Sequence, residues 1–151
     1  MKGKLIMSTK RLSVLLAILF LLGMVRVSAA AADEIKVIVN EKSIVFDQPP
    51  VIENGRTLVP LRAIFEALGA EVKWNSKTQT VTAIRGDITI VLTIGSSILT
   101  KNDIKIRLDV PAKLINGSTM IPVRAIAESF GSKVDWNANS RMVTITDSAA
   151  P

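Results

Sequence analysis

The chain has 151 residues, no cysteine, no histidine and no tyrosine, and a formal net charge of +6. Without cysteine and histidine it lacks thiol nucleophiles, the commonest general base at neutral pH and the usual transition-metal ligands, which excludes thiol enzymes, zinc enzymes and disulfide-stabilised scaffolds. An active site built only of carboxylates, lysines and arginines is the remaining enzymatic alternative, and no close pair of carboxylates supports it. We therefore predict no enzymatic activity, no cofactor and no metal.

Residues 1–32 have the pattern of an export signal peptide. A basic start precedes an apolar run over residues 12–25, and small residues follow at positions 28–32. The apolar run is shorter than the roughly 20 residues of a membrane-spanning helix, and a retained membrane anchor is the alternative. We predict cleavage between Ala29 and Asp33, a secreted or cell-wall-associated product, and no stable membrane anchor after cleavage.

The positive charge lies mostly in this N-terminal segment. Five of the nineteen basic residues and none of the thirteen acidic residues fall within residues 1–32. Residues 33–151 therefore carry fourteen basic and thirteen acidic side chains, a net charge of +1. This balance leaves no basic surface that could neutralise phosphates, so the sequence predicts no nucleic-acid partner.

The first elements after the signal are short strands. Two β-rich runs, residues 35–39 and 43–46, flank a polar turn at residues 40–42 and predict a hairpin. Asp47 and the prolines that follow it end the second run. The dipeptide Asn54-Gly55 predicts another tight turn, because both residue types tolerate positive φ.

A short helix is predicted directly after Pro60. Proline fits the first turn of a helix, where an N–H group has no partner in any case. Gly69 is placed to end the helix in the left-handed conformation. The apolar residues between them have the helical spacing i, i+3, i+4, i+7: Leu61, Ile64, Phe65 and Leu68.

Further strands follow the helix. Apolar and polar residues alternate around Val72 and Trp74 and again around Val81 and Ala83, with a polar turn at residues 75–78. This alternation is typical of paired strands. A turn at residues 85–87 and an apolar run at residues 88–94 predict one more strand.

The same signals return 62 residues later without a gap. Asn116-Gly117 repeats Asn54-Gly55, Pro122 repeats Pro60, and the apolar spacing returns in Val123, Ile126, Ala127 and Phe130. A sequence repeat with a fixed period indicates that one structural unit occurs twice. We predict one α+β domain over residues 33–148, made of two tandem ββαββ-like halves at about 35–86 and 97–147. Each half would place a short helix on a small antiparallel sheet.

Two arginines are candidate binding residues. Arg62 and Arg124 stand one helical turn before Glu66 and Glu128, which is the weaker order for such a pair and puts arginine at the positive end of the helix dipole. Interactions within the helix therefore do not explain why arginine stands at these two positions. Two explanations remain open: each arginine reaches a carboxylate or carbonyls of the sheet, or each binds an anionic ligand.

Two tryptophans are also candidates. Trp74 and Trp136 share a strand face with Val72 and Val134, and this favours packing in the core. The alternative is that they stack against a sugar or another ligand.

Residues 56–75 resemble a known module, the copper amine oxidase N-terminal domain-like family, also called the stalk domain. The similarity runs from Arg56 through Pro60, Arg62 and Trp74 to Asn75, returns in the second copy, and includes residues 90–96. The resemblance implies an accessory module of exported bacterial proteins, often found beside cell-wall hydrolases or proteases. Copper amine oxidase catalysis belongs to a separate domain that uses histidines and a tyrosine-derived quinone, and this chain has neither residue type.

The sequence thus predicts a secreted, non-catalytic interaction module of the cell envelope. Its partner would be an envelope protein, with self-association through exposed sheet edges as one form of protein contact. The alternative is a module that binds peptidoglycan or another cell-wall glycan. Arg62, Arg124, Trp74 and Trp136 are the predicted partner-binding residues.

Overall fold

The computed structural model describes residues 34–148, which belong to one compact unit spanning Asp33–Pro151. The predicted signal peptide lies outside the described residues. Of the described residues, 50% are in strands and 12% are helical, so the α+β expectation holds in its coarse form. None of the helices in this part of the chain has the length and apolarity to cross a membrane.

The elements of the first copy recur in the second with an offset of 62 residues. The first copy contains β1 (Lys36–Val39), β2 (Lys42–Ser43), β3 (Val51–Glu53), β4 (Arg56–Pro60), α2 (Leu61–Ala67), β5 (Glu71–Asn75) and β6 (Thr80–Arg85). The second contains β8 (Ile98–Lys101), β9 (Ile104–Arg107), β10 (Lys113–Ile115), β11 (Ser118–Pro122), α3 (Val123–Ser129), β12 (Lys133–Asn137) and β13 (Met142–Thr146). Between the copies lies β7 (Ile88–Thr93), which has no counterpart.

Tight turns fix the register of the hairpins. Asn54 and Gly55 have φ values of 49° and 71°, and Asn116 and Gly117 have φ values of 48° and 80°. Positive φ at both central residues defines the turn type whose twist matches paired strands. The two predicted turns are therefore confirmed.

Both helices begin and end where the sequence predicts. Each begins directly after a proline and buries one apolar face. At the end of α2, Gly69 has φ 77° and the N–H groups of Gly69 and Ala70 donate to the carbonyls of Glu66 and Phe65. This pair of hydrogen bonds satisfies carbonyls that a helix end leaves without partners, and the end of α3 repeats it.

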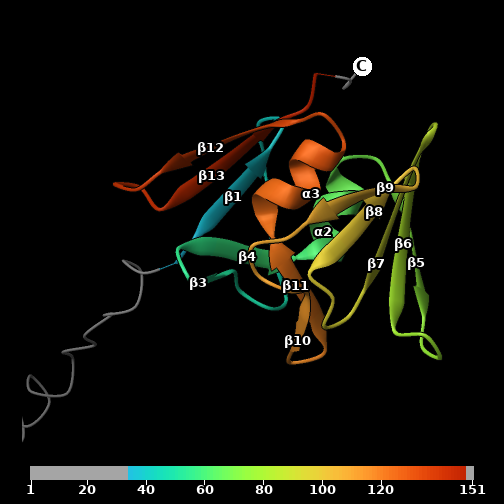
Figure 1. The fold of residues 1–151 in the computed structure, drawn as a ribbon. Helices are drawn as coiled ribbons and strands as arrows, with labels where there is room; N and C mark the ends of the chain where they lie inside the picture. The colour runs from blue at the N-terminus through green and yellow to red at the C-terminus, as the bar shows by residue number, and fades with distance from the viewer. Residues whose placement is uncertain (1–33, 149–151) are drawn as a thin grey trace, which may run out of the picture. The chain divides into compact units, whose positions relative to one another are not determined.

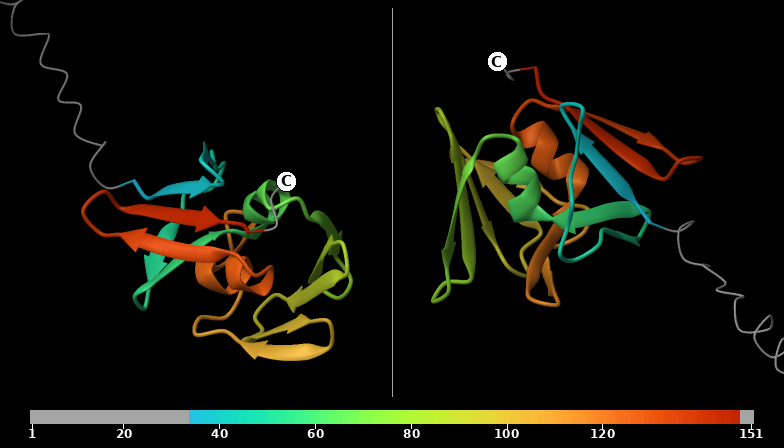
Figure 2. Two further views of the ribbon diagram at one scale, coloured as in Figure 1. Left: turned by 90° about the horizontal axis from the view of Figure 1, so that it is seen from above. Right: turned by 180° about the vertical axis from the view of Figure 1, so that it is seen from behind.

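Strands of the two copies are mixed in three sheets (Figure 1). One sheet has the order β12-β13-β1-β2, a second β10-β11-β4-β3, and a third β5-β6-β7-β8-β9. The helices lie between the first and the third sheet, as both views of Figure 2 also show. Every sheet therefore contains strands of both copies.

The prediction of two tandem halves, each with its own small sheet, is wrong in this respect. Each copy has the order ββββαββ, because residues 51–53 and 56–60 form an additional hairpin before the helix. β1 pairs in parallel with β13 from the far end of the chain. A copy taken alone would leave these strand edges without partners, so the two copies form one domain.

A pseudo-twofold axis relates the copies. In the central sheet β4 pairs antiparallel with β11, and Val59 lies opposite Ile121, its own counterpart at the offset of 62. The axis therefore passes through this pair. The pairs on either side, Leu58 with Pro122 and Pro60 with Met120, exchange places under the same rotation.

The core surrounds this axis. Phe65 of α2 and Phe130 at the end of α3 meet edge to face, with ring centroids 5.4 Å apart. Their counterparts are Ala127 and Leu68, so the place that a large ring takes in one copy holds a smaller residue in the other. All four side chains are buried, and the exchange of large and small residues keeps the core filled.

One arginine joins the ends of both helices. The Arg85 guanidinium donates to the carbonyls of Leu68 and Phe130, at 2.9 and 2.8 Å, and its carbon lies 4.6 Å from the centre of the Phe130 ring. It also forms an ion pair with Asp147, whose side chain is 4% exposed. Arg85 and Asp147 are counterparts, as are Leu68 and Phe130, so this cluster lies about the pseudo-twofold axis.

We predict that Arg85→Ala lowers the free energy of unfolding by about 3–5 kcal/mol, because the buried Asp147 carboxylate loses its cation. Equilibrium urea denaturation measures the loss. The control is Arg62→Ala, which removes an exposed ion pair and should cost less than about 1 kcal/mol. Equal losses for the two variants would contradict a central role for Arg85.

Candidate functional site: two equivalent grooves

A groove with a volume of about 600 Å³ opens beside α2, and we call it groove 1. Its walls are the segment 45–48, the start of α2, the faces of β5 and β6, and the hairpin β10–β11. The lining residues are Val45, Phe46, Asp47, Gln48, Pro60, Leu61, Arg62, Ala63, Glu66, Val72, Trp74, Val81, Leu114, Gly117, Ser118 and Thr119.

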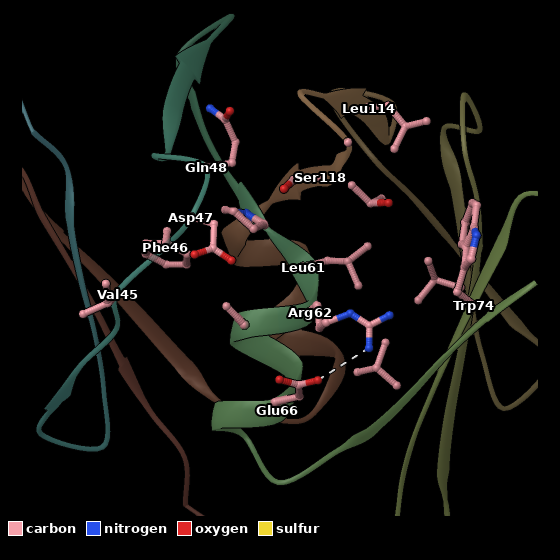
Figure 3. Close-up of a pocket in the computed structure, with 16 residues that line it drawn as sticks. Val45, Phe46, Asp47, Gln48, Leu61, Arg62, Glu66, Trp74, Leu114 and Ser118 are labelled. Atoms are coloured by element: carbon pink, nitrogen blue, oxygen red, sulfur yellow. Dashed lines mark ion pairs between the residues drawn. The ribbon is translucent and has the colours of Figure 1, made fainter.

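Groove 1 combines an aromatic ring with charged side chains (Figure 3). Arg62 extends from α2 towards Trp74 on β5, and its guanidinium lies 3.6 Å from the Glu66 carboxylate. Asp47 approaches from the other side of the helix. Trp74 is 42% exposed. Such a surface can pack against an apolar or planar group and hold a polar or charged group beside it.

A second groove, groove 2, has a volume of about 580 Å³. Its lining residues are Ile52, Gly55, Arg56, Thr57, Asp109, Pro122, Val123, Arg124, Val134, Trp136 and Val143. Each of these is the counterpart of a residue that lines groove 1. The two grooves are therefore the same feature repeated by the pseudo-twofold axis.

Neither groove belongs to one copy. In groove 1 the helix and β5 come from the first copy, whereas Leu114 and Ser118 come from the second. In groove 2 the origins are exchanged. A single copy could not form either groove, because the mixing of strands brings the wall residues together.

The predicted core packing of the tryptophans is wrong. Trp74 and Trp136 are 42% and 41% exposed, and each ring lies in the wall of a groove. Their neighbours Val72 and Val134 share the same strand face and are half-buried. This face is therefore covered only in part, and strand alternation alone cannot tell a groove wall from a core.

The two helical arginines do not reach the sheets. Arg62 and Arg124 each lie 3.6 Å from the glutamate one turn later, and their side chains are 57% and 61% exposed. Exposed pairs of this kind contribute little stability. The structure places one arginine and one tryptophan from the predicted set in each groove.

Sequence reasoning missed the third charged position of the grooves. Asp47, which the sequence predicts to end a strand, and its counterpart Asp109 each line a groove. In groove 2, Arg56 donates from Nε to Asp109 at 2.6 Å, and Ser118 stands at the equivalent position of groove 1. A comparison of charges between positions 62 residues apart would have found this difference.

Within residues 34–148 no group of three or more metal-ligating side chains lies close enough to hold a metal ion. The arrangement in both grooves is suited to binding, with ring faces, short apolar walls and opposed charges.

The sequence pattern of the copper amine oxidase N-terminal domain matches residues 38–145, so the chain belongs to this family. The match covers both copies and both grooves. It agrees with the resemblance seen at residues 56–75.

The chain is also similar to a protein from Brevibacillus choshinensis named "Protease inhibitor", with 31% identity over 134 residues. The similarity covers 87% of this chain and 40% of that relative. The chain thus spans well under half of the relative's length. Together, the family and this relative indicate a non-catalytic module.

We predict that Trp74→Ala lowers the free energy of unfolding by about 1–2 kcal/mol, because much of the ring already contacts water. The matched control is Phe65→Ala at a fully buried ring, where the loss should be about 3–5 kcal/mol. Thermal unfolding of both variants against the native chain measures the difference. A loss for Trp74→Ala as large as that of the control would restore the core interpretation.

Proposed function

We propose that this protein is a secreted, non-catalytic module that binds a protein partner at the cell envelope through its grooves. The observation that carries the proposal is the duplicated groove with a half-exposed tryptophan in its wall. Tryptophan and arginine are the residue types that dominate the binding energy of protein interfaces.

The rim of groove 1 supports a polypeptide partner. Val45 is 91% exposed and Leu114 is 49% exposed, so exposed apolar side chains lie on both walls of the groove. Clustered exposed apolar residues mark surfaces where proteins meet. A groove of this size would accept a few residues of an extended segment or a loop.

The Brevibacillus relative gives a second line of support. Its name, "Protease inhibitor", describes a protein that acts on another protein. Because this chain covers 40% of that relative, a protease is one partner class among several for this module.

Binding to a cell-wall glycan is the alternative function. One specific observation favours it: each groove pairs a half-exposed indole with charged side chains, Arg62 in groove 1 and Arg124 in groove 2. An aromatic face beside hydrogen-bonding groups also suits a sugar ring.

Self-association is a further form of protein contact, because Ile104 on the edge strand β9 is 67% exposed.

Site-specific photo-crosslinking tests the proposal. A photoreactive amino acid replaces Leu114 at the rim of groove 1, in the full chain expressed in the producing organism. We expect an adduct with a protein of distinct mass that protease digestion removes. The control replaces Asp87, which is exposed in the turn between β6 and β7 and lines neither groove.

The outcomes separate the alternatives. An adduct that collapses on digestion with a cell-wall-degrading enzyme would replace the protein partner with a glycan. An adduct of twice the chain mass would identify self-association. Equal adducts at positions 114 and 87, or none at either, would contradict a binding role for groove 1.

A further inference from the structure

The two grooves have similar volumes, but they differ in the contact made by the aspartate that lines each of them. In groove 2 the chain's own Arg56 spans the groove and donates to Asp109 at 2.6 Å. In groove 1 the equivalent position holds Ser118, whose side chain is too short to reach across. Among the described residues no ion pair involves Asp47, the counterpart of Asp109.

A different contact connects the walls of groove 1. The Asn116 side-chain amide donates to the Gln48 side-chain oxygen at 2.8 Å, joining the segment 45–48 to the hairpin β10–β11. Val110 occupies the counterpart position of Gln48, so groove 2 cannot form this bond. The walls of groove 1 are therefore tied by neutral groups, and the neighbouring carboxylate remains available.

The charges of the grooves differ accordingly. Groove 1 is lined by two carboxylates, Asp47 and Glu66, and by one cation, Arg62. Groove 2 is lined by two cations, Arg56 and Arg124, and by Asp109, and the Glu128 carboxylate lies 3.6 Å from Arg124 at the place of Glu66. Groove 1 thus has a surplus of one negative charge, whereas each cation of groove 2 is paired with a carboxylate.

We infer that groove 1 binds a cationic side chain of the protein partner, an arginine or lysine, against Asp47, while Arg56 fills the same place in groove 2. This inference rests on the protein-binding function proposed above and adds the chemistry of the bound residue. Groove 2 supplies the internal precedent, because there a guanidinium occupies the equivalent place.

The residues around Asp47 define what must flank the cation. Val45 at the rim is 91% exposed, and its counterpart beside groove 2 is the exposed Arg107. Trp74 and Leu114 present further apolar surface on the opposite wall. The expected ligand is therefore a basic residue with apolar neighbours. Arginine fits better than lysine, because its planar guanidinium matches a carboxylate and packs on aromatic rings.

The contribution of the ion pair itself should be modest. Asp47 is exposed, and exposed ion pairs are weakened by water and salt. Removal of either charge should weaken binding about fivefold. The larger share of the affinity would come from the apolar contacts, and the charge would select the residue that enters.

The two tryptophans allow each groove to be observed separately, because the chain has no others. Their indole N–H signals in nitrogen-15 NMR spectra of the full chain report on groove 1 (Trp74) and groove 2 (Trp136), and Trp74→Phe assigns them. The probe is a capped pentapeptide with the sequence glycine–leucine–arginine–leucine–glycine. Its control contains citrulline, which keeps the shape of arginine without the charge.

We expect the arginine peptide to shift the Trp74 signal and to leave the Trp136 signal in place. The citrulline peptide should bind about fivefold more weakly. On the variant Asp47→Asn the two peptides should bind equally, whereas Asp109→Asn should leave the preference of groove 1 unchanged. Equal binding of both peptides to the native chain would overturn the inference.

Exchange of the two distinguishing residues provides the sharpest test. Ser118→Arg should pair with Asp47 and abolish the Trp74 response, and Arg56→Ser should leave Asp109 without its cation and make Trp136 respond to the arginine peptide. Unfolding midpoints close to that of the native chain show that both variants are folded. A silent Trp136 in Arg56→Ser, or an unchanged Trp74 response in Ser118→Arg, would contradict the inference.

The peptide experiment and the crosslinking experiment can fail separately. A protein adduct at position 114 without any peptide response would leave the protein-binding role standing and remove the cationic residue from it. No adduct and no peptide response would remove both.

Discussion

The structure depends on one contact at its pseudo-twofold axis, where Arg85 of the first copy meets Asp147 of the second. The guanidinium satisfies a carbonyl at the end of each helix and covers the face of Phe130. Two identical copies would place two arginines or two aspartates at this point, and like charges in a half-buried site repel. The two copies are therefore complementary at this point because they are not identical.

The same axis explains why the grooves exist as a pair. Mixing of strands between the copies places each helix beside a hairpin from the other copy, and the space left between them is a groove. The backbone enforces the symmetry, whereas single side chains break it. Ser118 in place of Arg56, and Val45 in place of Arg107, make one groove apolar-rimmed and negative without changing the fold.

Local features could be predicted from the sequence because they depend on neighbouring residues. Pro60, the helical spacing that follows it and Gly69 fixed the first helix, and Asn54-Gly55 fixed a turn. The pairing of β1 with β13 could not be predicted, because it joins segments about a hundred residues apart that carry no mutual signal. The groove beside Trp74 is lined by Leu114 and Ser118 of the other copy, and no local pattern places them there, so the candidate site could be predicted only in part.

The strand β7 has a consequence for how many copies this fold can hold. In the first copy the chain leaves β6, turns back as β7, and so provides an edge on which β8 of the next copy pairs. At the end of the second copy, the corresponding edge of β13 is already occupied by β1. A third unit added in series would have to displace the first strand of the chain. The arrangement therefore closes on itself at two units, unlike solenoids, in which each added unit stacks on the last.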